Sequence, residues 1–567
     1  MSEVVADPRP VLAVLVSAIA VALIIASYRR PNVREGWSVV AAVTKFAIIA
    51  SMLPGVLDGR IYVWSAGPFV ADIEFALRAD PLGMLFALLA SFLWIFTSFY
   101  AAGYMRGLDE HAQTRFFAAF AASLSTAVGI AFAQNLLTIF IFYELLSLVT
   151  YPLVAHDEDD KARIAGRKYL AYTFFGGGVF LLAGTVLTYH LTETYGGNAT
   201  TEFAAGGIPE LASVASADPL FAQLTFALLA AGFGVKAAVM PLHSWLADAM
   251  VAPTPVSGLL HAVAVVKSGA FGVARVILDV FGPDVVNDIG MHIPLAILAA
   301  ITLTAASIIA LRKDNLKRRL AYSTTAQLSY IVLGLSLLHP VALVGALLHI
   351  PAHAFGKLTL FFCAGAIHVE THTDNISEMA GIGKRMPLTM TAFTVGAAGM
   401  AGIPLVAGFV SKFYLLIGSA GAGGIGEVGA GAAVMDQWLG LLFAFSLIVS
   451  GILNIAYFWP IIYTAFFEAE DAYDAKPLLE FPMGGEHRGE AVPDGGHEAD
   501  HDDHHHHGGA PPGGWERHKP FFESTWLMMA PISLLAVGAL TLGVIPDHAI
   551  FLELARYIVT EVTGVTV

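Results

Sequence analysis

The sequence predicts an all-α, polytopic membrane protein with about fourteen transmembrane helices. Hydrophobic residues make up 56% of its 567 residues and charged residues only 13%, which is typical of membrane proteins. Apolar runs of about twenty residues, bounded by Gly, Pro or charged residues, recur along the chain. Basic residues also gather in alternate connections between these runs, as they do in multi-spanning proteins.

The predicted helices follow one another closely along the chain. The first run, from Val11, lacks a small-residue cleavage site before Arg29, so we expect a retained helix and not a cleaved signal peptide. Connections as short as Gln134-Asn135 require antiparallel neighbours. The predicted spans are residues 11–28, 37–57, 80–102, 114–132, 135–155, 167–190, 221–240, 253–280, 291–311, 319–338, 341–368, 387–416, 438–467 and 525–546.

The distribution of Lys and Arg predicts the orientation. With the N-terminus outside, twenty of the thirty Lys and Arg residues fall in connections and adjoining span ends on the cytoplasmic side, and five fall in outside segments and span ends. The outside connections 191–220 and 417–437 contain neither Lys nor Arg. This asymmetry follows the positive-inside rule. We therefore expect a multi-pass protein of a bacterial inner (cell) membrane, in contact with the lipid bilayer, with both termini outside.

Several classes of function are disfavoured by composition. The net charge of −15 implies no nucleic-acid partner. The single cysteine, Cys363, allows neither a disulfide framework nor a cysteine-based metal site. We find no nucleophile triad, phosphate loop or haem ligand pair, so we expect no cofactor and no covalent catalysis.

The segment GFGVKAAVMPLHSWLADAM, residues 232–250, places Lys236 deep in an apolar run and interrupts that run at Pro241. A lysine at the bilayer centre costs about 2.5 to 3.5 kcal/mol on insertion scales. A proline removes a backbone donor, which a membrane tolerates where the freed groups face protein or water. Lys236 could extend to a headgroup, but its depth favours a buried proton site beside a helix break.

An acidic residue, Glu144, lies at mid-depth in the span 135–155. A buried carboxylate is costly unless it is neutralised or paired, and Lys236 is the natural partner. Such a pair changes strength when a proton arrives. A static structural ion pair is the alternative.

Histidine and lysine recur in two later spans. The span 253–280 contains His261 and Lys267, and LLHIPAHAFGKLTLFF contains His349, His353 and Lys357 at intervals of four residues. This interval aligns the last three on one helix face, which predicts a polar axis in the membrane. His349 and His353 could instead bind a metal, but no acidic residue accompanies them.

The pattern around Lys236, a deep lysine in an apolar run that a proline interrupts, occurs again in GAAGMAGIPLVAGFVSKFYLLIG. Here Pro404 breaks the run and Lys412 lies deep inside it. Two broken helices in corresponding halves are typical of inverted-repeat transporters. We therefore predict two inverted five-helix repeats, with breaks in helices 7 and 12. The expected organisation is helices 1–3 in residues 1–113, repeats in 114–280 and 291–467, a cytoplasmic loop in 468–524, and helix 14 with a tail in 525–567.

The five basic residues that lie away from the span ends are all lysines, the fifth being Lys45. Lysine gives up its proton readily when buried, whereas arginine stays protonated. The use of lysine instead of arginine at these positions favours a function in proton transfer. Lys45 lies nearer a helix end, where it could equally extend to the interface.

These motifs together resemble a known family. FYELLSLVTYPL, GFGVKAAVMPLHSWLADAM with APTPVSGLLHA, HAFGKLTLFFCAG and GFVSKFYLL are similar to segments of the antiporter-like subunits of respiratory complex I, Mrp-type monovalent cation/proton antiporters and membrane-bound hydrogenases. Within that family the D-type Mrp subunit is the best match. The resemblance covers roughly residues 80 to 465, and about twenty residues after the last span disfavour the complex I subunit with a long lateral helix.

The resemblance implies a function for each of these residues. It implies fourteen helices with a half-channel in each repeat, and a coupled pair of Glu144 and Lys236. It implies a gate at Lys412 and a central hydrophilic axis formed by His261, Lys267, His353 and Lys357.

The segment 468–524 differs from the rest because it is acidic and rich in Pro and Gly, which predicts a flexible loop. It contains HEADHDDHHHH. A solvated acidic loop is the favoured interpretation, with weak metal binding by its histidines as the alternative; these are His504, His505, His506 and His507.

We therefore predict a proton-translocating subunit of a multi-subunit cation/proton antiporter, exchanging H⁺ for Na⁺ or another monovalent cation with other membrane subunits as partners. One alternative is a proton-pumping subunit of a complex I-like dehydrogenase, a membrane-bound hydrogenase or a bicarbonate-uptake complex. A second is a non-transporting membrane scaffold whose polar axis only joins helices.

Overall fold

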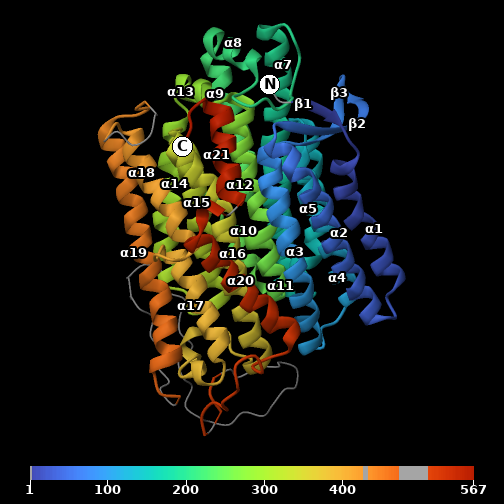
Figure 1. Cartoon of the computed structure of the whole chain (residues 1–567), viewed down its shortest axis with the longest axis vertical. Helices are drawn as coiled ribbons and strands as arrows, with labels where there is room; N and C mark the ends of the chain where they lie inside the picture. The colour runs from blue at the N-terminus through green and yellow to red at the C-terminus, as the bar shows by residue number, and fades with distance from the viewer. Residues whose placement is uncertain (1–2, 426–431, 471–508, 512, 549) are drawn as a thin grey trace.

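The computed structural model describes residues 3–425, 432–470, 509–511, 513–548 and 550–567. It is a tall bundle of helices with a small sheet at one end (Figure 1). The elements are β1 (Glu3–Ala6), α1 (Arg9–Ala26), α2 (Pro31–Leu57), β2 (Arg60–Val70), β3 (Ile73–Ala79), α3 (Pro81–Gly107), α4 (Gln113–Phe132), α5 (Leu136–Val154), α6 (Asp160–Phe174), η1 (Phe175–Leu181), α7 (Leu182–Gly196), α8 (Pro209–Ala217), α9 (Pro219–Lys236), α10 (Ser244–Asp248), η2 (Ala249–Val251), α11 (Thr254–Gly258), η3 (Leu259–Val263), α12 (Val265–Arg275), η4 (Val276–Phe281), α13 (Pro283–Asp288), α14 (His292–Leu311), α15 (Leu316–Ser336), α16 (Pro340–Thr371), η5 (Ile376–Glu378), η6 (Ile382–Lys384), α17 (Pro387–Ala401), α18 (Ala407–Ala422), α19 (Gln437–Phe467), α20 (Trp526–Val544), η7 (Pro546–His548) and α21 (Ile550–Thr563).

These helices confirm the predicted helical membrane fold. Within the described residues, eleven are long and apolar enough to cross a membrane by length and composition. The three predicted spans outside that set also contain helices: 253–280 and 387–416 are interrupted, and 319–338 is rich in polar residues. The count of fourteen crossings and the two inverted repeats stay predictions.

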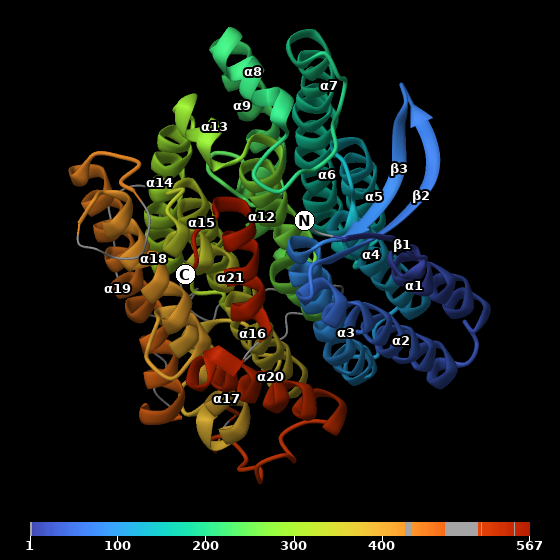
Figure 2. The same ribbon diagram turned by 45° about the horizontal axis from the view of Figure 1, so that its top comes forward.

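The structure contains a three-stranded sheet that the sequence-based prediction lacked: β1 precedes the first predicted span, and β2 and β3 lie between the second and third. β1 pairs in parallel with β2 and β2 pairs antiparallel with β3. The turn between β2 and β3 places Ala71 and Asp72 at positive φ. The sheet lies beside the ends of α1–α5 (Figure 2), and it fixes the N-terminus at the end of the bundle where α3 begins.

The core is organised around α16, whose most apolar stretch is completely buried. α16 packs against α15, α17, α18, α20 and α21 and lies in the middle of the bundle (Figure 1). The predicted tail after residue 546 contains the amphipathic helix α21, which packs on α3 and α16. Because α16 contacts both halves of the chain, its polar residues can join them.

Candidate functional site

The first helix break lies directly after Lys236. α9 ends at this residue, and a non-helical segment that contains Pro241 precedes α10. Some polar groups at the break have partners nearby: Trp245 Nε1 donates to the Val235 carbonyl at 2.9 Å, and the Met240 N–H donates to Thr302 Oγ1 at 3.1 Å. These bonds stabilise an interrupted helix in apolar surroundings.

Lys236 is completely buried against α5. Its Nζ donates to the Tyr143 carbonyl at 2.6 Å and lies 3.5 Å from the centroid of the Tyr143 ring. Tyr143 is itself fixed, because its hydroxyl donates to the Gly232 carbonyl at 2.7 Å. The ammonium group of Lys236 is therefore held by a hydrogen bond to one backbone oxygen and by a cation–π contact with one aromatic ring, and both interactions favour a positive charge.

Glu144 lies beside this contact without forming an ion pair. The residue is half-buried, but both of its carboxylate oxygens are buried, and neither has a hydrogen-bond partner among the described residues. The charges of Glu144 and Lys236 are nevertheless close enough to interact electrostatically. The carboxylate lies against Gly177 of the π-helix η1, where any side chain would overlap it. Gly177 thus creates the space that Glu144 occupies.

Lys267 and His353 meet in the middle of the bundle. Lys267 Nζ lies 2.8 Å from His353 Nδ1, and both side chains are completely buried. The other ring nitrogen of His353 has no partner among the described residues. His261, in the π-helix η3, is also buried, with neither ring nitrogen hydrogen-bonded within the described chain. π-Helical segments are rare and frequent at functional sites.

His349 joins this centre to the second half of the chain. Its Nδ1 lies 2.8 Å from Ser411 Oγ, and its Nε2 donates to Gln327 Oε1 at 2.9 Å. The amide nitrogen of Gln327 donates to the Met400 carbonyl at 3.2 Å. The rings of His349 and His353 are 6.2 Å apart. A chain of polar groups therefore extends from α12 to α17.

The second helix break lies between α17 and α18 and contains Pro404. Lys412, in the second turn of α18, donates a hydrogen bond to the Met400 carbonyl, and its Nζ lies 4.4 Å from the centroid of the Tyr330 ring. The Met400 carbonyl thus accepts bonds from both Lys412 and Gln327. It lies in the last turn of α17, where carbonyls lack helical partners.

Lys357 lies one turn beyond His353 but contacts a different helix. It is completely buried, and its Nζ donates to the Leu320 carbonyl of α15 at 3.0 Å. His349, His353 and Lys357 therefore share a helix stripe, as predicted, but their partners lie on three neighbouring helices: α15 and α18 for His349, α12 for His353 and α15 for Lys357.

None of the five lysines deep within spans has a carboxylate partner in the part of the chain that the structure describes. Among the described residues, no carboxylate oxygen lies within 4.0 Å of the ammonium nitrogen of Lys45, Lys236, Lys267, Lys357 or Lys412. Lys45 is completely buried and donates to the Leu124 carbonyl at 2.8 Å. Lys45 is therefore held inside the bundle and does not extend to the interface.

Sequence reasoning missed several polar partners, and it left one candidate untested. Gln327 Nε2 donates to Asn454 Oδ1 at 3.3 Å. Both are amide side chains in transmembrane helices, and their polarity could have identified them as candidate site residues. The backbone carbonyls that accept hydrogen bonds from the lysines could not be predicted from the sequence, because every residue has a carbonyl. His504, His505, His506 and His507 lie outside the described residues.

Comparison with known proteins assigns the fold and the motifs to one family. Residues 133–436 match the family described as NADH:quinone oxidoreductase/Mrp antiporter, TM. Residues 66–117 match the family described as NADH-ubiquinone oxidoreductase (complex I), chain 5 N-terminus.

Individual relatives agree with this match. The chain is 31% identical to NADH-quinone oxidoreductase subunit N of Desulforudis audaxviator (strain MP104C), over 87% of this chain and 85% of that protein. It is 33% identical to a probable K(+)/H(+) antiporter subunit of Rhizobium meliloti (strain 1021) over 65% of this chain, but spans only 36% of that protein. A chain of the Mrp complex from Dietzia sp. DQ12-45-1b has the same fold, with a TM-score of 0.75 and 21% identity over 98% of this chain and 97% of that chain. The chain therefore belongs to the family of NADH:quinone oxidoreductase/Mrp antiporter membrane subunits.

Proposed function

We propose that the chain is a proton-translocating subunit of a multi-subunit monovalent cation/proton antiporter, with Na⁺ as the exchanged cation. The relatives named above include one subunit of an antiporter and one chain of an Mrp complex, which supports both the activity and the presence of other membrane subunits. The positive-inside asymmetry supports a bacterial inner membrane location with both termini outside.

The observation that carries this proposal is the set of buried lysines without carboxylate partners. A charged ammonium in such a place is costly, and a backbone carbonyl only partly offsets that cost. Neutral lysine avoids it and can then accept a proton from a neighbour. Each lysine therefore has two accessible protonation states, which a proton relay needs.

The order of the buried groups along the bundle suggests the order of the relay, and contacts support its central steps. Protons pass from Glu144 and Lys236 to His261 and Lys267. They then pass through His353, with Lys357 beside it, and His349 to Lys412. The bond between Lys267 and His353 and the chain from His349 through Gln327 to Met400 support the central steps. Protonation of one group changes the affinity of its neighbour for a proton, because like charges at these distances repel.

Two substitutions test the proposal in a strain that requires Na⁺ efflux. Lys236→Ala and Glu144→Ala are expected to abolish growth at high Na⁺ and Na⁺-dependent proton movement in inverted vesicles. Lys161→Ala, at an exposed position in the first turn of α6, is the matched control. Assembly of each variant is checked by co-purification with the partner subunits. Full growth and normal antiport by both variants would overturn the proposal.

A second candidate function comes from the relative that the chain matches over most of both lengths, a subunit of NADH-quinone oxidoreductase. In this case the same relay moves protons in a redox-driven complex. Proton movement that requires an electron donor and is insensitive to Na⁺ would favour this candidate.

A further inference from the structure

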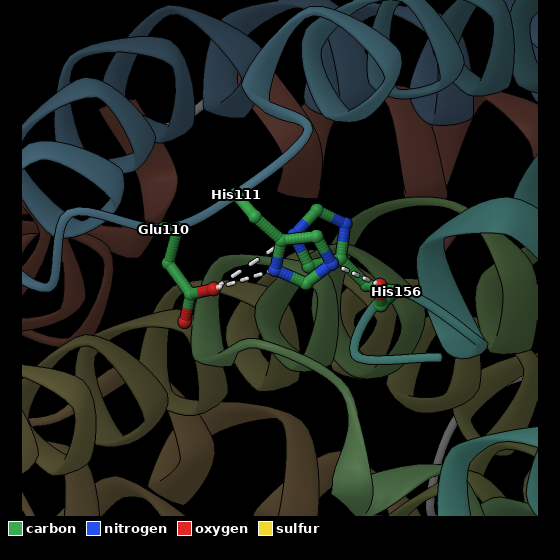
Figure 3. A group of neighbouring side chains, drawn as sticks. All are labelled: Glu110, His111 and His156. Atoms are coloured by element: carbon green, nitrogen blue, oxygen red, sulfur yellow. Dashed lines mark hydrogen bonds and ion pairs between the residues drawn. The ribbon is translucent and has the colours of Figure 1, made fainter. Parts of the chain in front are cut away.

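Three potential metal ligands meet in two connections away from the lysines. Glu110 and His111 follow α3, and His156 follows α5. Glu110 Oε2 lies 3.8 Å from His111 Nδ1 and 3.9 Å from His156 Nε2. One ligand atom from each residue lies within 4.8 Å of the others. Figure 3 shows the carboxylate facing both rings. Sequence reasoning did not find this cluster because 45 positions separate the two histidines.

His111 is oriented as a metal-binding histidine usually is. Its Nε2 lies 3.0 Å from the His156 carbonyl. A carbonyl oxygen only accepts hydrogen bonds, so Nε2 bears the proton and the lone pair lies on Nδ1. Nδ1 is the atom that faces Glu110 (Figure 3). A backbone carbonyl that fixes the tautomer of a histidine in this way is typical of metal sites.

The environment of His156 indicates separately that this cluster binds something. Its side chain is completely buried, yet neither ring nitrogen has a hydrogen-bond partner within the described residues. The ring packs against Phe116, with centroids 5.7 Å apart. A buried polar group without a partner costs about 1 to 3 kcal/mol.

We propose that Glu110, His111 and His156 bind one divalent transition-metal ion, with Zn²⁺ as the best fit. Two imidazoles and one carboxylate form a typical zinc ligand set that leaves a fourth position for water. Around a tetrahedral zinc ion, ligand atoms lie roughly 3.4 Å apart. The two distances from Glu110, 3.8 and 3.9 Å, are close to this value, and the three ligand atoms, which all lie within 4.8 Å of one another, would draw together around the ion. Nearby, the positive charge of Arg115 is balanced by an ion pair with Glu158.

A bound ion would join two hairpins of the bundle. Glu110 and His111 lie in the connection between α3 and α4, and His156 lies in that between α5 and α6. Both connections lie on the predicted cytoplasmic side. The ion would hold the end of α5, the helix that carries Glu144.

The test measures metal binding directly by the purified full-length chain. The six histidines of residues 497–507 are first replaced by serine, because they could bind metal themselves. In this background Zn²⁺ binding is measured by equilibrium dialysis, and Co²⁺ is used as a spectroscopic probe of tetrahedral coordination. We expect one ion per chain. Glu110→Gln, His111→Ala and His156→Ala should each weaken binding more than about tenfold.

Two variants control for charge and for exposed histidines. Asp160→Asn removes an exposed negative charge at the start of α6, and His190→Ala removes an exposed histidine elsewhere; neither should change the affinity. If His156→Ala fails to fold, Glu110→Gln and His111→Ala decide, since both side chains are partly exposed. No binding in the serine background, or unchanged binding in His111→Ala and Glu110→Gln, would overturn the proposal.

Discussion

The two helix breaks hold their lysines in opposite ways. Lys236 is the last residue before its break and donates to a carbonyl of another helix, beside Glu144. Lys412 follows its break and donates to Met400, a carbonyl at the end of the preceding half-helix. Lys236 is therefore held by a contact between two helices, and Lys412 by a carbonyl at the helix end that forms the break.

The surroundings of the two lysines differ in charge as well. Glu144 gives the first break a carboxylate that interacts with Lys236. At the second break the nearby polar groups are the amide of Gln327 and the hydroxyl of Ser411, both neutral, with His349 between them. The charge of a proton on Lys236 can therefore be balanced by a nearby carboxylate, whereas a proton on Lys412 is stabilised by a neutral carbonyl.

The largest effect is expected from replacing either lysine by arginine. Lys236→Arg and Lys412→Arg keep a positive charge, but a guanidinium does not release its proton. Positioned proton transfer contributes about 100-fold or more to a rate, so proton movement in inverted vesicles should fall by at least about that factor. Lys161→Arg, at an exposed position, should have no effect. Normal transport by both buried variants would show that these lysines act only as fixed charges.

A smaller effect, specific to the first break, is expected from Gly177→Ala. The added methyl group would overlap Glu144 Oε1, whereas at Gly178 nothing lies within 4 Å. Small displacements of a reacting group can cost up to about 100-fold, and we expect roughly a tenfold loss of Na⁺-dependent proton movement. Gly178→Ala is the matched control on the same helix. Equal activities of the two variants would show that transport does not depend on the position of the Glu144 carboxylate.

The smallest effect is expected from Gln327→Leu, which is specific to the second break. Leucine has nearly the same size but leaves the Nε2 of His349 without its acceptor. An unsatisfied buried group costs about 1 to 3 kcal/mol, which corresponds to at least about a fivefold slower rate if the bond forms during transfer. Ser329→Ala is the control, because this hydroxyl bonds only to its own helix, at the Thr325 carbonyl. A loss as large as that of Lys412→Arg would instead place Gln327 in the relay itself.

Sequence patterns predicted the helices well, and the strands poorly. Each predicted span coincides with helical structure because twenty consecutive apolar residues satisfy their backbone groups in lipid only as a helix. The β2–β3 hairpin was missed because it lies in a connection between two spans, where apolar runs carry no information. The breaks were predictable because Pro241 and Pro404 cannot donate a backbone hydrogen bond.

The sequence by itself determined which residues carry charge into the membrane. Lysine, histidine and glutamate in apolar runs are costly wherever the helices pack, so Lys236, Lys412 and Glu144 could be identified without coordinates. Only the tertiary structure decided their partners. Lys236 meets Tyr143, and His349 meets Gln327, across positions distant in the chain. Most of these partners are carbonyls or neutral amides, whose use depends on how the helices pack and end.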